Sequence, residues 1–339
     1  MADERDGAGR LTLSVMRAAV CLIGCALACD RGRAADPPPA AAPETAPAPA
    51  PARSSCTLAP LPLRRPAVRR IVAIGDLHGD VDAARDALRT AGAIDDRAHW
   101  VGGDLVVVQT GDVLDRGDSE HALLDLLAAL ETEARAAGGA VISLLGNHEL
   151  MNAAGDFRYV TAAGAHAFDD VPGVAAPSTL PERWRSRYGA LAPGGTYARR
   201  IAEHGAIAIV GDTVFSHAGV FGRWVARADE LNQDARCWLD GQASDRPEAM
   251  GADDSPLWSR AAGGSSVDCA LVRRALDALR VARMVVGHTV QSHGVNAACD
   301  GALWRIDAGL ARYYGGPIEV LEIAAGAAPR VLTGARSAH

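Results

Sequence analysis

The sequence contains no lysine, so its 34 basic side chains are all arginine, and asparagine occurs only four times in 339 residues. Contacts to phosphate or carboxylate groups must therefore come from Arg, His, backbone N–H groups or a bound metal. The formal net charge is −7. This balance argues against a general nucleic-acid-binding protein and against a polybasic membrane-binding surface, because both need an excess of positive charge. We expect no nucleic-acid partner.

Residues 1–35 resemble a bacterial export signal. Arg17 precedes an apolar run of eleven residues, too short for a spanning helix, which needs about 20 residues. Cys25 and Cys29 each follow a lipoprotein-like cleavage site, and ordinary cleavage after Ala28 is the alternative. We therefore expect an exported protein, either periplasmic or a membrane-anchored lipoprotein of a bacterium, whose only membrane contact is an N-terminal lipid.

The remaining chain divides into a linker and one large domain. Residues 36–69 are rich in Pro and Ala, a composition that favours extended polyproline II and a semi-rigid linker. Residues 70–339 have enough apolar content for one catalytic domain. Within this domain residues 160–200 are irregular, with a Pro- and Gly-rich middle, and we interpret them as a cap insertion beside the site. We expect a monomer.

Four cysteines follow the leader, namely Cys56, Cys237, Cys269 and Cys299. An even number in an exported chain permits two disulfides with three possible pairings, and buried free thiols are the alternative. None of the spacings is that of a zinc site. Cys299 and Arg305 also match Cys-x5-Arg, the bare signature of cysteine-dependent tyrosine phosphatases. That segment leads into a strand instead of a helix N-terminus that could bind phosphate, which argues against this mechanism.

The first half of the domain alternates strands and helices. Short apolar runs predict strands at 71–74, 105–108 and 140–145, with helical spacing over 81–91 and 119–130 between them. This βαβαβ order implies parallel strands with right-handed crossovers. Ligands bind at the carboxyl ends of such strands, and each of these strands ends in a polar motif.

The second half is richer in strands. The predicted strands lie at 207–210, 213–216, 284–286, 303–306, 318–323 and 331–332. Gly211-Asp212 between the first two is a possible tight hairpin turn. Together, the two halves predict an α/β fold with two packed mixed β-sheets flanked by helices.

Six side chains that could bind metal follow predicted strands, close to glycines. They are Asp76, His78, Asp112, Asn147, His217 and His288. This mixture of oxygen and nitrogen donors suits Mn, Fe or Zn better than Ca or Mg, which prefer oxygen alone.

The motifs GDLHGD (75–80), GDVLDRG (111–117) and GNHE (146–149), followed by SHAG and GHT, occur in one order along the chain. They resemble the signature of the PPP-type, calcineurin-like metallophosphatases. The stretches 102–120 and 144–160 are most similar to the Shewanella-like protein phosphatase branch of that family. The chain departs from the eukaryotic serine/threonine enzymes because Ile-Asp-Ala-Gly replaces their Ser-Ala-Pro-Asn-Tyr segment near the C-terminus.

The resemblance implies a four-layer αββα sandwich that holds two divalent or trivalent metal ions, with Mn expected and Fe or Zn possible. By this resemblance Asp76 and His78 bind the first metal and Asp112 bridges both. Asn147, His217 and His288 would complete the second metal site.

The same resemblance assigns the remaining catalytic roles. Arg116 and Arg260 would hold phosphate oxygens, which suits the bidentate geometry of guanidinium groups. His148 would protonate the leaving group and Asp115 would orient it. A hydroxide that bridges the two metals would attack phosphorus directly.

We therefore expect a dimetal-dependent phosphomonoesterase that acts on phosphoproteins, at phosphotyrosine, at phosphoserine and phosphothreonine, or at all of them. Two alternatives stay open. One is a hydrolase of the same fold that acts on nucleotides, dinucleoside polyphosphates or another small phosphoester. The other is a catalytically silent metal-binding surface module, which would not need the pair His148 and Asp115.

Overall fold

The computed structural model describes residues 56–337. The predicted export signal and residues 36–55 of the predicted linker lie outside this range. Residues 56–69, which we expected to be linker, are attached to the domain. Strand β1 (Arg64–Arg65) pairs in parallel with β5 (Ile207–Val210), and Cys56 forms a disulfide with Cys237. The composition of the segment could not reveal this, because its partners lie more than 100 residues further along the chain.

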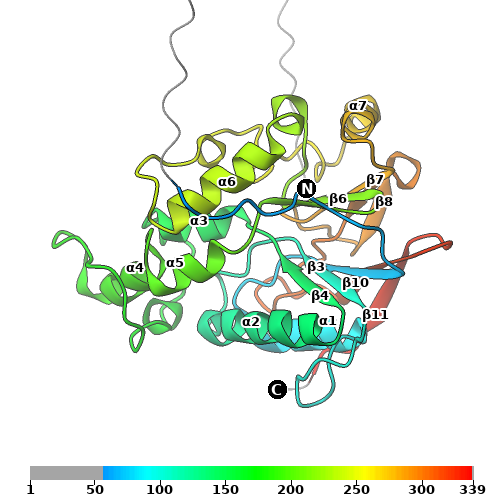
Figure 1. The fold of residues 1–339 in the computed structure, drawn as a ribbon. Coiled ribbons are helices and arrows are strands. Elements are labelled where there is room, and N and C mark those ends of the chain that lie inside the picture. Colours follow the sequence, from blue (N-terminus) through cyan, green and yellow to red (C-terminus); the bar gives the residue numbers. More distant parts are fainter. Residues whose placement is uncertain (1–55, 338–339) are drawn as a thin grey trace, which may run out of the picture. The chain divides into compact units, whose positions relative to one another are not determined.

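One sheet has five strands in the order β11-β10-β2-β3-β4. Its strands are β2 (Arg70–Ile74), β3 (Val106–Gln109), β4 (Ala140–Ser143), β10 (Ile318–Ala324) and β11 (Arg330–Gly334). Strands β2, β3 and β4 are parallel, and the predicted βαβαβ unit is confirmed. The connecting helices are α1 (Val81–Thr90) and α2 (Glu120–Ala136). Both lie on the outer face of this sheet (Figure 1).

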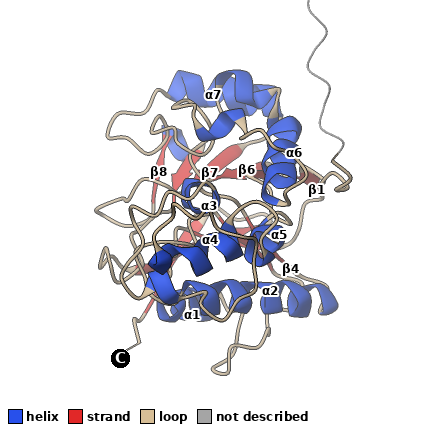
Figure 2. Cartoon of the chain, turned by 90° about the vertical axis from the view of Figure 1, so that its left-hand side faces the viewer, coloured by secondary structure: helices blue, strands red, loops and turns tan. Residues whose placement is uncertain are grey.

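The other sheet has six strands in the order β1-β5-β6-β7-β9-β8. Besides β1 and β5 it contains β6 (Thr213–Ser216), β7 (Arg283–Val286), β8 (Asn296–Ala298) and β9 (Leu303–Arg305). Strands β5 and β6 form the predicted antiparallel hairpin. Helices α6 (Ala228–Leu239) and α7 (Cys269–Leu279) lie on the opposite side of the molecule from α1 and α2 (Figures 1 and 2).

Successive side chains of a strand point to opposite faces of the sheet, and this divides the core into layers. In β2, Ile71 and Ala73 belong to the apolar cluster shared by the two sheets, whereas Val72 and Ile74 belong to the cluster beneath the helices. The inter-sheet cluster also includes Val285 and Leu321, both with 0% exposure. Burial of such a side chain is worth about 1.5–3 kcal/mol. The predicted packing of two mixed sheets between helices is therefore confirmed as an αββα sandwich.

Two of the predicted metal-binding motifs, GDLHGD and GNHE, also start helices. Asp80, the last residue of GDLHGD, is the N-cap of α1, where its carboxylate accepts a hydrogen bond from the Ala83 N–H at 2.9 Å. Such a cap contributes about 1 kcal/mol. Helix α3 (Asn147–Ala153) begins within GNHE, directly after β4. A strand end, a polar loop and a helix start therefore coincide at each of these motifs.

The region 160–200 is more regular than we predicted. It contains η1 (Gly164–His166), η2 (Glu182–Trp184), α4 (Arg185–Leu191) and α5 (Thr196–Ile201). The helices were missed because segments of three to seven residues are too short to show helical periodicity. The remaining one-turn helices are η3 (Gly222–Val225), η4 (Glu248–Met250) and η5 (Cys299–Gly301).

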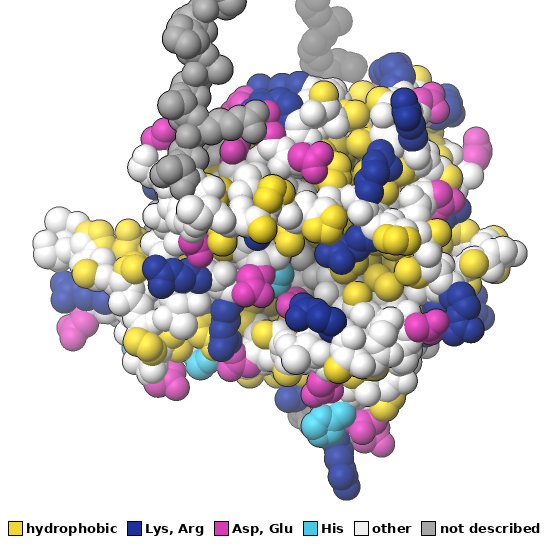
Figure 3. Space-filling model, viewed as in Figure 1, with side chains coloured by type: hydrophobic (Ala, Val, Ile, Leu, Met, Phe, Trp, Pro, Cys, Tyr) yellow, Lys and Arg dark blue, Asp and Glu magenta, His cyan; other side chains and the backbone are white. Residues whose placement is uncertain are grey.

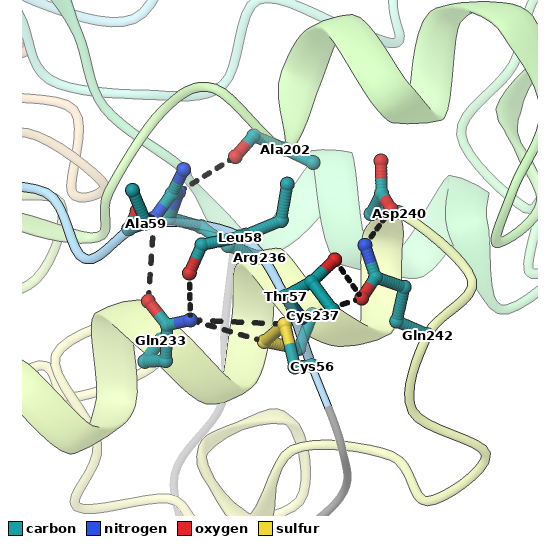
Figure 4. The surroundings of a disulfide bond; sticks show 10 residues. All are labelled: Cys56, Thr57, Leu58, Ala59, Ala202, Gln233, Arg236, Cys237, Asp240 and Gln242. Carbon is teal, nitrogen blue, oxygen red and sulfur yellow. Dashed lines mark hydrogen bonds between the residues drawn. A yellow bond between two sulfur atoms is a disulfide. The ribbon is translucent and has the colours of Figure 1, made fainter.

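Both pairs of cysteines form disulfides, Cys56–Cys237 and Cys269–Cys299. Near the first pair, the Gln233 side chain donates to the Leu58 carbonyl at 2.9 Å, so the start of the described chain lies on α6 (Figure 4). Because Cys299 is bonded to Cys269, it is not a free nucleophile.

Arg and acidic side chains are intermingled over the face shown in Figure 3. Arg223 and Arg227 both form ion pairs with Glu248. Within residues 56–337, no helix has both the length and the apolar character needed to cross a bilayer.

Candidate dimetal site

The predicted metal ligands lie where strands of both sheets end. Asp76 and Asp112 follow β2 and β3, and Asn147 is the first residue of α3 after β4. From the other sheet, His217 directly follows β6 and His288 follows β7. The carboxyl ends of the central strands thus bring the motifs to one rim, as predicted.

The backbone at this rim is strained. Within the described residues, nine side-chain-bearing residues have positive φ, and five of them are predicted site residues, namely His78, Asp112, Asp115, Arg116 and His288. Each such residue costs on the order of 1–3 kcal/mol and persists only where its surroundings hold it. This concentration of strain indicates a functional site.

Two glycines allow the carboxylates of the predicted ligands Asp112 and Asp76 to come close. A Cβ atom at Gly146 would lie 2.1 Å from Asp112 Oδ1, and one at Gly287 would lie 2.3 Å from Asp76 Oδ1. Any larger residue at either position would displace a carboxylate. The glycines in GNHE and GHT are therefore required by the position of the neighbouring carboxylate.

Three imidazole rings are oriented by backbone carbonyls. Nδ1 of His78 lies 3.0 Å from the Leu114 carbonyl oxygen, and Nδ1 of His217 lies 2.9 Å from that of Thr110. Nε2 of His288 lies 3.2 Å from the Trp258 carbonyl oxygen. A carbonyl oxygen cannot donate, so the facing nitrogen carries the proton and the other ring nitrogen is left with a lone pair. This is the usual arrangement of metal-binding histidines.

Four nitrogen and oxygen atoms of the predicted ligands converge at one point, where burial opposes protonation of His217 but the Asp112 carboxylate outweighs it and raises the His217 pKa. Nε2 of His217 lies 3.0 Å from Asn147 Oδ1, 3.3 Å from Asp112 Oδ2 and 3.0 Å from His288 Nδ1. Four lone-pair atoms at these distances repel one another unless a proton or a cation lies between them. The Asn147 oxygen and the Asp112 carboxylate complete a mixed donor set that fits Mn, Fe or Zn.

A second group of donors shares Asp112. Nε2 of His78 and Nε2 of His148 each lie 3.8 Å from Asp112 Oδ2. Asp112 thus belongs to two His/Asp clusters that could each hold a metal, one with His78 and His148, the other with His217 and His288. Asp76 lies beside the cluster of His217 and His288, because its Oδ1 is 3.9 Å from His217 Nδ1 and its carboxylate accepts the His288 N–H.

The electrostatics favour cations at this point. Burial raises the pKa of Asp76 well above its usual value, and the nearby carboxylates of Asp307 and Asp112 add to the effect. Burial lowers the pKa of His78 to about 4 and that of His288 to about 3. The two imidazoles are therefore neutral, which is the metal-binding form, and the crowded carboxylates need positive charge beside them.

His148 and Asp115 lie in contact. Nδ1 of His148 is 2.5 Å from Asp115 Oδ2, and both side chains are buried. Burial opposes protonation of His148, but the carboxylates of Asp112 and Asp115 outweigh it and raise its pKa to about 9. A protonated His148 is a proton donor at neutral pH.

The two predicted phosphate-binding arginines lie at the edge of the site. The Arg116 guanidinium lies 4.5 Å from the ring centre of Tyr159 and 4.9 Å from that of Tyr313. Arg260 donates to Thr289 Oγ1 at 3.2 Å, next to His288. A groove of about 560 Å³ opens here, and its lining includes Tyr159 and Trp258, the residue whose carbonyl faces His288.

Sequence reasoning missed five buried polar residues of this region. They are Glu120, Glu149, Asn152, Arg187 and Asp307. Glu149 lies in the GNHE motif, and Asp307 stands where the sequence departs from the eukaryotic pattern, so both had a signal. Glu120 and Asn152 lie in the stretches 102–120 and 144–160 that resemble the Shewanella-like branch, but no local pattern marked either as buried. Arg187 had no signal.

Comparisons with known proteins agree with this geometry. The calcineurin-like phosphoesterase family model matches residues 69–292. Shewanella-like protein phosphatase 2 of Arabidopsis thaliana is 36% identical over 304 residues, which covers 78% of this chain and 77% of that protein. The cold-active protein-tyrosine phosphatase of a psychrophilic Shewanella species superimposes with a TM-score of 0.67 at 25% identity, covering 80% of this chain and 83% of that one.

A serine/threonine phosphatase of Saccharomyces cerevisiae shares the fold, with a TM-score of 0.54 at 15% identity over 80% of this chain and 81% of that chain. The resemblance drawn from the three motifs is thus confirmed, and so is the conclusion that the chain is a metallophosphatase. The chain belongs to the calcineurin-like phosphoesterase family and is similar to the Shewanella-like protein phosphatases.

Proposed function

We propose that this protein is a dimetal phosphomonoesterase that removes phosphate from phosphoproteins, with phosphotyrosine among its substrates. The observation that supports this proposal most directly is the convergence of Asn147 Oδ1, Asp112 Oδ2 and His288 Nδ1 on His217 Nε2. A buried His148–Asp115 pair lies beside them. The similarity to protein phosphatases, one of them titled a protein-tyrosine phosphatase, supports a phosphoprotein substrate and favours tyrosine.

We assign the metals to the six predicted ligands, which are Asp76, His78, Asp112, Asn147, His217 and His288. Mn is the ion we expect, and Fe or Zn would also suit these donors. Two bound cations would supply charge neutralisation and would lower the pKa of a water molecule at the site.

The remaining assigned residues bind the substrate and move the proton. Arg116 and Arg260 would hold the oxygens of the phosphoryl group by charge-assisted hydrogen bonds. His148 would donate its proton to the leaving oxygen, and Asp115 would hold the ring so that Nε2 faces the reacting atoms. General acid catalysis of this kind contributes about 10²–10⁴-fold.

The compartment is part of the proposal. Two disulfides in a chain of this size indicate an oxidising environment. We propose that the protein is exported and acts outside the cytoplasm, either free in the periplasm or anchored through Cys25 or Cys29. Mass spectrometry of the mature N-terminus from membranes would separate the two, because only a lipoprotein carries a lipid-modified cysteine.

The function is tested by turnover with added Mn²⁺ on a panel of phosphotyrosine, phosphoserine, phosphothreonine and dinucleoside polyphosphate substrates. We expect kcat of Asp112→Asn to be at least about 10²-fold lower than that of wild type. Removal of one group that stabilises charge in the transition state has an effect of this size. Asp96→Asn is the matched control, because the Asp96 side chain is fully exposed. Equal rates for wild type and Asp112→Asn would contradict the assignment of Asp112.

The alternatives predict other outcomes. Preference for the dinucleoside polyphosphate would favour the small-molecule hydrolase, and no turnover on any phosphoester by the metal-loaded wild type would favour the silent binding module. Metal content, measured for both proteins, would show whether a loss of turnover follows from a loss of metal.

A further inference from the structure

A buried arginine lies behind the proposed proton donor. Arg187 is the third residue of α4, in the predicted cap insertion, and its exposure is 0%. Its Nη1 and Nη2 donate to the two oxygens of Glu120 at 2.5 Å and 2.7 Å, which is a bidentate pair. The pair is as buried as any in the described part of the chain, since both side chains have 0% exposure.

Every nitrogen of this guanidinium has a partner. Nε donates to Asn152 Oδ1 at 2.8 Å, and Nη1 also donates to the Gly164 carbonyl at 2.9 Å. Nη2 lies 3.4 Å from Asp115 Oδ1. Arg187 therefore joins the insertion, α2 and α3 to the residue that contacts His148.

These contacts fix the Asp115 carboxylate. Its Oδ2 faces His148 Nδ1 at 2.5 Å, and its Oδ1 accepts from Asn152 Nδ2 at 2.9 Å and faces Arg187. The Asp115 N–H donates to Glu120 Oε1 at 2.6 Å. With both oxygens and the backbone held, Asp115 cannot rotate away from the imidazole.

A contribution to stability does not by itself explain why this network of charged side chains is buried. Removing two charges from water costs several kcal/mol per ion, and apolar replacements of buried ion pairs are often neutral or stabilising. The network does, however, end on the His148 ring, whose other nitrogen points toward Asp112. Catalytic groups act well only when their supporting side chains keep them within a fraction of an ångström of the reacting atoms.

We propose that Arg187 is a positioning residue for leaving-group protonation: through Asp115, Asn152 and Glu120 it holds His148 in the orientation in which it donates its proton. This inference rests on the proposed function, because it requires hydrolysis of a phosphoester. It gives the insertion a role in the chemistry, although Arg187 itself does not touch the substrate.

The leaving group distinguishes this role from a purely structural one. An alkoxide or phenolate of high basicity, such as that of tyrosine with a pKa of about 10, needs a proton as the bond to phosphorus breaks. The much less basic 2,4-dinitrophenolate leaves without one. A defect in positioning His148 should therefore slow the hydrolysis of phosphotyrosine or phenyl phosphate and leave the hydrolysis of 2,4-dinitrophenyl phosphate almost unchanged.

The test compares Arg187→Met with wild type on these two leaving groups, with Mn²⁺ present and metal content measured. We expect kcat on phenyl phosphate to fall about 10–100-fold, part of the range of general acid catalysis. The kcat on 2,4-dinitrophenyl phosphate should change less than about 3-fold, and Arg187→Lys should recover part of the loss. Arg185→Met is the matched control, since Arg185 lies in the same helix and is exposed.

A milder variant keeps the inference testable if Arg187→Met does not fold. Asn152→Leu keeps the approximate shape and both charges but removes the bridge between Arg187 and Asp115, and it should show the same selective loss at smaller size. Equal loss on both substrates at unchanged metal content, in either variant, would overturn the positioning role. Absence of wild-type turnover on both substrates would instead contradict the proposed function.

Discussion

Replacing Glu149 by Gln should lower both the stability of the fold and its affinity for the proposed metals, because Glu149 holds the two loops that surround them. The Glu149 side chain is 3% exposed, and its two oxygens accept four backbone hydrogen bonds. Oε1 accepts from Val113 at 2.8 Å and Leu114 at 3.1 Å, and Oε2 accepts from Asp112 at 2.9 Å and Gly146 at 2.8 Å. One carboxylate thus ties GDVLDRG to GNHE.

The size of the effect follows from this count. In Gln an NH₂ group replaces one of the two carboxylate oxygens. The two backbone N–H groups that donated to that oxygen therefore lose their acceptor. Each hydrogen bond to a charged group is worth about 1.5–3 kcal/mol, and two of them give about 3–6 kcal/mol. That is a large part of the roughly 5–15 kcal/mol by which domains are stable. Loss of such outer contacts also lowers metal affinity about 10–100-fold.

Urea unfolding in the presence of a chelator would measure the change in stability without metal, and calorimetric titration with Mn²⁺ would measure affinity. Glu133→Gln is the matched control, because Glu133 accepts one backbone N–H, that of Trp100 at 2.7 Å, lies 3.5 Å from His99 Nδ1 and is partly exposed. The control should lose less than about 1 kcal/mol. A loss of that small size for Glu149→Gln, with unchanged Mn²⁺ affinity, would refute the reasoning.

Three further results are expected. Joint replacement of Cys56 and Cys237 by Ser should cost about 5 kcal/mol by the chain-entropy relation for a 181-residue separation, measured by urea unfolding; an unchanged midpoint would contradict this value. His204 is paired with Glu131 at 3.1 Å, and this hydrogen bond and charge raise its pKa against the opposing effect of burial. The pair therefore stabilises the fold below the unfolded His pKa of about 6.5, and this contribution is lost as pH rises through the raised folded value. His204→Gln should accordingly be more destabilising at pH 6 than at pH 9, and equal losses would count against the pair. Chelation of divalent ions should lower the melting temperature, because lone pairs converge at the site; an identical melting curve would argue against bound metal.

Much of the site could be predicted because its residues follow strands directly. Asp76, Asp112 and Asn147 come at the ends of apolar runs, so local pattern and the rule for parallel strands suffice to bring them together. Glycine beside each motif is also a local signal, and Gly146 shows its physical cause in the contact with Asp112.

The rest depends on contacts that no local pattern encodes. Arg187 lies 35 residues from Asn152 and 67 from Glu120 in sequence, on a helix of seven residues, and it is one of 34 arginines. Strand β1 has two residues and follows a Pro- and Ala-rich stretch, so its pairing with β5 leaves no periodic trace. In both cases the fold, and not the segment, determines the environment of the side chain.

The Cys56–Cys237 bond also decides how the domain would respond to a pulling force. Tension applied through the residues before Cys56 passes by a covalent path into helix α6, and the two-residue ladder between β1 and β5 carries none of it. Mechanical unfolding from the N-terminal side would therefore have to begin at α6 while the disulfide is intact, and at β1 once it is reduced.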